Sequence, residues 1–113
     1  MENTKYRNLD PDRHKLIFKA IVGSQAHGTS TPESDIDYKG VYMQTIDDLV
    51  SFGYEPIIEV SKDESYYEIR RFIELLMEAN PNAIEILFSP DDCIVQTSPQ
   101  FELLRLYKNC FLT

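Results

Sequence analysis

The alternation of apolar and polar positions predicts three strands in the first part of the chain. Residues 16–22 form a short apolar run rich in β-branched side chains, which is typical of a largely buried strand. Residues 36–43 alternate well enough for a second strand. Residues 44–53 form a connector with one helical turn. A third strand is expected at residues 56–60, with an extension through residues 63–67 as the longer alternative.

Helical periodicity takes over in the second part of the chain. The clearest helix is expected over residues 67–79, where apolar residues recur at the helical spacing and form one stripe. Two more helices are expected to begin at a polar cap followed by proline, at Asn80-Pro81 and at Ser98-Pro99. Strands followed by helices predict an α+β fold, with the helices packed on a small mixed β-sheet.

Length and composition fit one globular domain. The 113 residues, 42% of them apolar and 27% charged, suit one ordinary core. We therefore expect residues 1–113 to form a single minimal domain, either complete or the N-terminal part of a longer architecture.

The polar start lacks the apolar core of a secretory signal, no run is long enough to span a bilayer, and Cys93 and Cys110 lack metal-site spacing. These features predict a cytoplasmic protein with no membrane partner.

The formal net charge of −8 narrows the range of ligands. It argues against broad, non-specific binding to nucleic acid, because such binding requires a basic surface. It leaves open a local basic groove and a nucleotide that arrives with its metal ion.

Gly23 and Ser24 follow directly after the first predicted strand. If a helix starts there, its free backbone N–H groups form an anion site. Gly23 then lets a phosphate approach the backbone closely, and Ser24 adds a hydroxyl donor. The same dipeptide is more often a simple turn, so it carries little weight alone.

Asp35 and Asp37 are the second polar feature of this region. On a strand, their spacing places both carboxylates on one face, where they repel each other unless a cation lies between them. Oxygen ligands without His or Cys suit Mg²⁺. A loop with solvated aspartates is the alternative for this pair taken alone. A phosphate-binding turn and a metal-binding pair are together what phosphoryl or nucleotidyl transfer requires.

The two features together resemble the signature of the DNA-polymerase-beta-type nucleotidyltransferase superfamily, in which Gly-Ser is followed, after a spacer, by Asp-x-Asp. The longer stretch of residues 23–40 is similar to the bacterial and phage branch described as RNA-repair-pathway nucleotidyltransferases. Members of this branch usually carry Arg-Gly after the aspartates, where this chain has Lys39-Gly40. Residues 67–90 also resemble the branch, so the resemblance covers residues 17–90.

The resemblance implies a palm-like nucleotidyltransferase core that uses two Mg²⁺ ions, with Mn²⁺ as an alternative metal. It implies that Gly23 and Ser24 contact the phosphates of an NTP, and that Asp35 and Asp37 bind the metal ions. It also implies a third carboxylate on a later strand, which binds metal and serves as the base for the incoming hydroxyl group. Asp63 is the candidate, because the branch has an aspartate shortly before its Tyr-x-x-Arg helix.

The sequence leaves alternatives open for the third carboxylate and for the roles of His27 and Lys39. On a continuous strand, Glu59 and Asp63 share one face and Glu64 points to the other, although a bulge reverses this choice. Asp63 is therefore the first choice, with Glu64 and Glu59 behind it. His27 either touches a phosphate or base of the nucleotide or only hydrogen-bonds locally. Lys39 either reaches phosphate or points to solvent.

These assignments predict a Mg²⁺-dependent nucleotidyltransferase that moves a nucleoside monophosphate from an NTP such as ATP to a hydroxyl acceptor and releases pyrophosphate. The acceptor stays open among an RNA end, a protein side chain and a small molecule. The alternative function is a non-catalytic nucleotide-binding or protein-interaction module, such as a partner-dependent or antitoxin-like relative. The apolar C-terminal segment, residues 101–112, either packs within the chain or offers a surface for a protein partner or a homo-oligomer.

Overall fold

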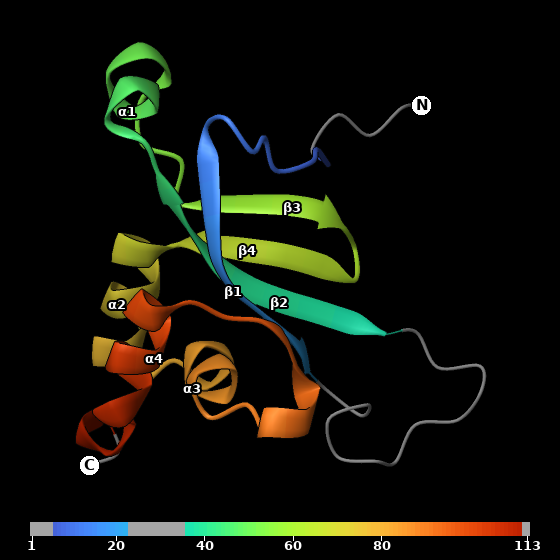
Figure 1. Cartoon of the computed structure of the whole chain (residues 1–113), viewed down its shortest axis with the longest axis vertical. Coiled ribbons are helices and arrows are strands. Elements are labelled where there is room, and N and C mark those ends of the chain that lie inside the picture. Colours follow the sequence, from blue (N-terminus) through green and yellow to red (C-terminus); the bar gives the residue numbers. More distant parts are fainter. Residues whose placement is uncertain (1–5, 23–35, 112–113) are drawn as a thin grey trace.

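A five-stranded mixed sheet forms the frame of the molecule, which confirms the predicted α+β class (Figure 1). The computed structural model describes residues 6–22 and 36–111. The strand order is β3-β4-β2-β1-β5. Among the strands of the described residues, β2 and β4 run parallel and the other neighbouring pairs are antiparallel. The strands are β1 (His14–Val22), β2 (Asp37–Gln44), β3 (Ile57–Ser61), β4 (Glu64–Glu68) and β5 (Ile94–Gln96).

Three of the α-helices gather on one side of the sheet, and α1 lies apart, beyond the end of β2 (Figure 1). None of the helices in the described ranges is both long and apolar enough to cross a membrane. The helices are α1 (Ile46–Phe52), α2 (Ile69–Met77), α3 (Pro81–Leu87) and α4 (Pro99–Leu106), with short 3₁₀ helices at Asp91–Cys93 and Lys108–Phe111.

The main core lies between the sheet and α2, α3 and α4. Phe101 of α4 is buried and stacks on Phe18 of β1, with ring centroids 4.1 Å apart. Phe72 of α2 contacts the ring of Phe101 at a centroid distance of 5.6 Å. The C-terminal segment therefore packs within the chain through Phe101. Among the residues of this segment whose burial the structure describes, the large apolar side chains that are exposed are Leu103, Leu106 and Tyr107.

A second, smaller core covers the opposite face of the sheet. It consists of the buried side chains of Tyr42, Ile58 and Tyr66. Leu9, from the segment before β1, and Leu16 pack against it. Both faces of the sheet are thus apolar along its middle, as a mixed sheet covered on two sides requires.

Gly40 lies where the backbone of β1 and the ring of Tyr66 leave no room for a side chain on β2. A β-carbon added there would overlap the carbonyl oxygen of Phe18 and would lie 2.8 Å from the nearest carbon of the Tyr66 ring. The register of β1 on β2 shifts between Leu16 and Phe18, which is a β-bulge beside this contact. The close approach therefore requires glycine in the Lys39-Gly40 unit.

The helix starts follow the predicted caps. The Asn80 side chain accepts hydrogen bonds from the backbone N–H groups of Asn82 and Ala83, and the Ser98 hydroxyl accepts one from Phe101. These bonds satisfy N–H groups that have no partner inside the helix. The prolines at the first helical positions need no such bond.

Two sequence expectations were wrong at the third strand. The strand does not continue through residues 63–67; instead β3 and β4 form an antiparallel hairpin with a turn at Lys62 and Asp63. The following helix begins at Ile69 and not at Tyr67, because Tyr67 still pairs with Ile57 as part of β4. The connector after β2 is also more regular than expected, since it holds the seven-residue helix α1.

We predict that replacing Phe101 with alanine lowers the free energy of unfolding by about 3–5 kcal/mol, because it removes a buried ring from the core. Urea denaturation followed by circular dichroism measures this change. Leu103→Ala on the same helix is the matched control. Its side chain is 59% exposed, so we expect a change within about 0.5 kcal/mol. Equal effects of the two substitutions would contradict the proposed packing of α4.

We predict that Gly40→Ala destabilises the domain by at least about 2 kcal/mol, because the added methyl group overlaps a backbone oxygen. The denaturation midpoint again measures the effect. The double variant Gly40→Ala, Tyr66→Leu tests the cause. Shrinking the ring should not restore stability, because the Phe18 carbonyl remains in place; a restored midpoint would assign the clash to the ring instead.

Candidate active site

The last residue of β1, the first residue of β2 and the turn before β4 lie together where these strands end or begin. We call this place the acidic edge of the sheet. Asp37, the first residue of β2, pairs with Val22, the last residue of β1. On the other side, the backbone N–H of Tyr38 donates to the carbonyl of Asp63 at 2.8 Å. Asp37 and Asp63 therefore lie on adjacent backbone segments, although 26 positions separate them in the chain.

The pleat of β2 decides which side chains accompany Asp37. Side chains two residues apart share a face, so Asp37, Lys39 and Val41 lie on the face covered by α2, α3 and α4, where Val41 joins the main core. In the parallel pair with β4, Lys39 is aligned with Ser65. The Lys39 ammonium donates to the Ser65 hydroxyl at 3.1 Å.

Glu64 belongs to the opposite face of the sheet. It is aligned with Tyr38, accepts a hydrogen bond from the Tyr66 hydroxyl and forms an ion pair with Lys19 at 3.8 Å. The Lys19 ammonium also lies 4.6 Å from the centre of the Tyr38 ring. The Glu64 side chain therefore interacts with Tyr66 and Lys19 on one face of the sheet, and Asp37 lies on the other face.

Glu59 lies one strand further away, because it belongs to the edge strand β3 and pairs with Ser65 of β4. Of the three carboxylates considered from the sequence, Asp63 is the one whose backbone adjoins β2 at the level of Asp37. The backbone N–H of Asp63 donates to the Ser61 hydroxyl at 3.2 Å. Asp63 stays the preferred prediction for the third carboxylate.

Four predicted site residues lie outside the described part of the chain: Gly23, Ser24, His27 and Asp35. Their roles stay predictions from the sequence. The described residues Val22 and Asp37 nevertheless bound the connection that holds all four, so it begins and ends at this edge of the sheet.

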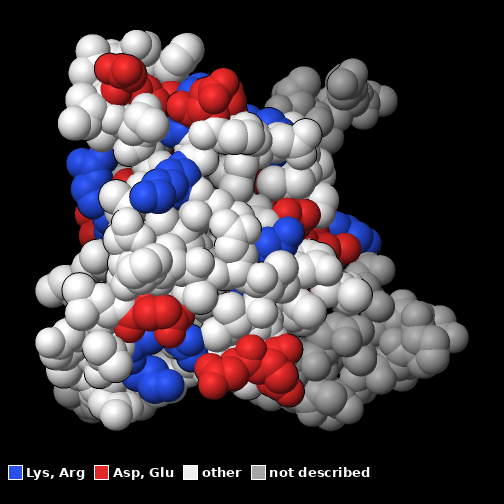
Figure 2. All heavy atoms as spheres, in the orientation of Figure 1, with Lys and Arg blue, Asp and Glu red and all other residues white. Residues whose placement is uncertain are grey.

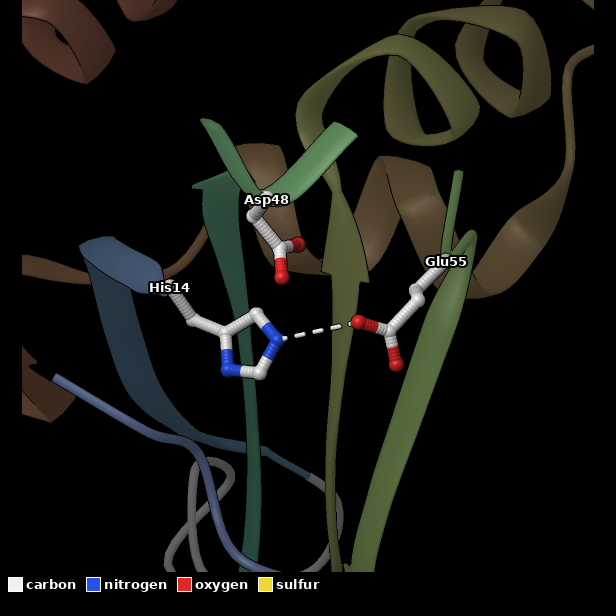
Figure 3. A group of neighbouring side chains, drawn as sticks. All are labelled: His14, Asp48 and Glu55. Carbon is white, nitrogen blue, oxygen red and sulfur yellow. Dashed lines mark hydrogen bonds and ion pairs between the residues drawn. The ribbon is translucent and has the colours of Figure 1, made fainter. Parts of the chain in front are cut away.

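A second group of ionisable side chains lies at the opposite end of the sheet (Figure 3). No motif or spacing in the sequence predicted this group. His14 opens β1, Asp48 belongs to α1 and Glu55 precedes β3. Their nearest ligand atoms lie within 4.8 Å of one another, a spacing that a metal ion could bridge. Figure 3 shows all three side chains directed toward a common point, with the His14 ring nitrogen Nε2 3.3 Å from Glu55.

Arginines of the chain already occupy the carboxylates of this group. Arg13 forms ion pairs with both Asp48 and Glu55, and Arg7 forms another with Glu55. His14 Nδ1 accepts a hydrogen bond from the backbone N–H of Asp10 at 2.9 Å, so on a neutral ring the proton resides on Nε2, facing Glu55. The guanidinium groups supply the positive charge that a metal would bring, and we assign the group to structural ion pairing.

The ion pairs shift the pKa values of both carboxyl groups in one direction. Burial alone would raise the pKa of Asp48, but hydrogen bonds from Gln44 and Arg13 outweigh it and lower that pKa. Burial likewise opposes ionisation of Glu55, and hydrogen bonds from Arg7 and His14 bring its pKa below the usual value. Both groups therefore stabilise the fold as carboxylates.

On the face shown in Figure 2, acidic and basic side chains of the described residues are interspersed. The described residues form no broad basic surface on this face. This distribution agrees with the net charge of −8 and gives no footprint for a long nucleic acid on this face.

We predict that acid destabilises the wild-type chain more steeply than an Asp48→Asn variant. Carboxylates with lowered folded pKa values stabilise fully above their unfolded pKa, near 4, and lose this contribution as the pH falls through the folded pKa. Urea midpoints measured between pH 6 and pH 3 give the two slopes. Asp47→Asn, at the exposed neighbouring position of α1, should keep the wild-type slope. Equal slopes for wild type and Asp48→Asn would contradict the assignment.

Comparisons with known proteins show similarity to one described family and to a phage protein. A family model described as "RlaP: RNA repair pathway DNA polymerase beta family" matches residues 2–113. An uncharacterized 38.9 kDa protein of Enterobacteria phage T4, from the nrdC-mobD intergenic region, is 25% identical over an alignment of 95 residues, which covers 74% of this chain. The chain spans only 28% of the length of that phage protein. No solved structure matches.

Proposed function

Because the chain belongs to the RNA repair pathway DNA polymerase beta family, we propose that it is a Mg²⁺-dependent nucleotidyltransferase. It moves a nucleoside monophosphate from an NTP to a hydroxyl group and releases pyrophosphate. Two contacts at the start of β2 carry this proposal. Asp37 pairs with the last residue of β1, and the next residue, Tyr38, donates its backbone N–H to the carbonyl of Asp63. The strand ends that meet here are the end of β1, which precedes Gly23-Ser24 in the sequence, and the start of β2, which carries Asp37.

The donor set suits the proposed metal. Asp37 and Asp63 offer carboxylate oxygens on adjacent backbone segments, and Asp35 adds another two positions before Asp37. Oxygen-only ligands combined with substrate phosphates are the usual environment of Mg²⁺. When bound, Mg²⁺ neutralises the charge of the triphosphate and lowers the pKa of the attacking hydroxyl group.

The remaining roles follow from the chemistry of the transfer. Gly23 and Ser24 bind the phosphates through backbone N–H groups and a hydroxyl donor, and His27 and Lys39 add further donors. Asp63 accepts the proton of the acceptor hydroxyl group. The hydroxyl oxygen then bonds to the α-phosphorus as the bond to the pyrophosphate group breaks.

An RNA end is the first acceptor to test, because the family is described by its association with RNA repair. The interspersed charges and the net charge of −8 favour recognition of a short end over binding along a long strand. A hydroxyl group of a protein side chain and a small molecule with a hydroxyl group are the next acceptors.

The alternative is a module that binds nucleotide without turnover. The observation that favours it is the limited span of the match, since the chain corresponds to 28% of the phage protein. If the acceptor site requires the remainder of such an architecture, this domain binds the nucleotide and a partner supplies the rest.

We predict that the chain transfers label from α-³²P-NTPs to RNA oligonucleotides with a free 3′ hydroxyl group in the presence of Mg²⁺. Asp37→Asn and Asp63→Asn should each lower the rate about 10³-fold, because each removes several kcal/mol of charge stabilisation. Glu64→Gln is the matched control and should change the rate only a few-fold, because Glu64 serves the opposite face of the sheet.

Calorimetry with ATP and Mg²⁺ separates the two functions. Binding without transfer to any of the three acceptor classes supports the module and removes the enzyme proposal. Absence of both binding and transfer overturns both functions. A large loss in Glu64→Gln together with an active Asp63→Asn variant would assign the third carboxylate to Glu64.

A further inference from the structure

Lys39 lies on the sheet between two small residues. Its neighbour across β1 is Ala20, and its neighbour across β4 is Ser65. Ala20 is buried in the main core. Because neither neighbour projects far from the sheet, the long lysine side chain can lie along the sheet and reach β4. The hydrogen bond of 3.1 Å to Ser65 records this position.

Ser65 is well placed to hold this ammonium group. Its residue is only 6% exposed, so its hydroxyl oxygen is largely shielded from water and benefits from a protein donor. A bond from a charged donor is stronger than one from a neutral group. The lysine side chain is a flexible four-carbon chain. A hydrogen bond from its ammonium group to the buried Ser65 hydroxyl reduces the number of conformations that the side chain adopts.

The held ammonium lies next to the acidic edge of the sheet. Lys39 follows Asp37 by two residues on the same face of β2, a separation of about 7 Å along the strand. On the adjacent strand, Ser65 follows Asp63, which lies in the turn before β4, by two residues; the direction is the same because β2 and β4 are parallel. The pair Lys39–Ser65 therefore lies two residues further along the parallel strands than Asp37 and Asp63.

We propose that Ser65 is a positioning residue that holds the Lys39 ammonium where it binds a phosphate oxygen of the nucleoside triphosphate. The inference rests on the proposed function, since it places the triphosphate at this edge. A cation behind the carboxylates complements the negative charge of a triphosphate, and a compact ammonium group binds phosphate as a point charge. Ser65 itself does not touch the substrate; it acts through Lys39.

The test is a double-mutant cycle on binding, measured by isothermal titration calorimetry with ATP and Mg²⁺. Lys39→Met should weaken binding about tenfold or more, and Ser65→Ala about fivefold. In the double variant, binding should be no weaker than in Lys39→Met alone, because the serine acts only through the lysine. Ser65→Thr keeps the hydroxyl group and should restore binding to near the wild-type level.

Two controls separate positioning from a merely structural role. Adenosine has no phosphate, so its binding should be the same in wild type and Ser65→Ala. Ser51→Ala removes an exposed hydroxyl group from α1 and should leave ATP binding unchanged. If Ser65→Ala unfolds, Ser65→Cys keeps the shape and replaces the hydroxyl with a weak acceptor; it should show the same fivefold loss.

The outcomes are distinct. Wild-type affinity in a folded Ser65→Ala or Ser65→Cys variant, or additive losses in the double variant, overturn the role of Ser65 and leave the proposed function standing. Equal loss of ATP and adenosine binding assigns Ser65 to general structure and overturns the inference as well. Failure of the wild-type chain to bind ATP removes the proposed function, and this inference with it.

Discussion

The structure depends on how closely β1 and β4 approach the central strand β2. At Gly40 the Phe18 carbonyl of β1 and the Tyr66 ring of β4 leave no space for a side chain. A slip of one residue in either pairing would bring a side chain into this space and would turn every residue of β2 to the opposite face. The same contact therefore keeps Val41 toward the main core and holds Lys39 and Asp37 on its side of the sheet.

The two ends of β2 have different tasks. Its last residue, Gln44, hydrogen-bonds to Asp48 and Glu55. The ion pairs of these two carboxylates with Arg13 connect α1 and the segment before β3 to the residue that precedes β1. Its first residue, Asp37, lies at the candidate active site, about 23 Å away along the strand. Arginines of the chain neutralise the carboxylates at the stabilising end. At the other end, we assign that task to metal ions brought in with the nucleotide.

Local chemistry explains the parts of the fold that could be predicted. The apolar runs became β1 and β2, and Asn80 and Ser98 cap their helices, because strand patterning and capping depend on neighbours a few positions apart. The β3–β4 hairpin was missed, since its turn at Lys62 and Asp63 lacks the glycine that usually marks a two-residue turn. The three residues of β5 are too few to give a period.

The chain alone was sufficient to indicate the family and to propose Gly23, Ser24, Asp35 and Asp37, because these residues form one short motif whose spacing can be read directly. The other relations required the folded arrangement. Ser65 reaches Lys39 across 26 positions, and Arg13 reaches Asp48 across 35. Such pairs depend on which strands are neighbours and on their register, and no local pattern encodes either. The hairpin that brings Asp63 beside β2, and directs the Glu64 side chain to the opposite face of the sheet, has the same origin.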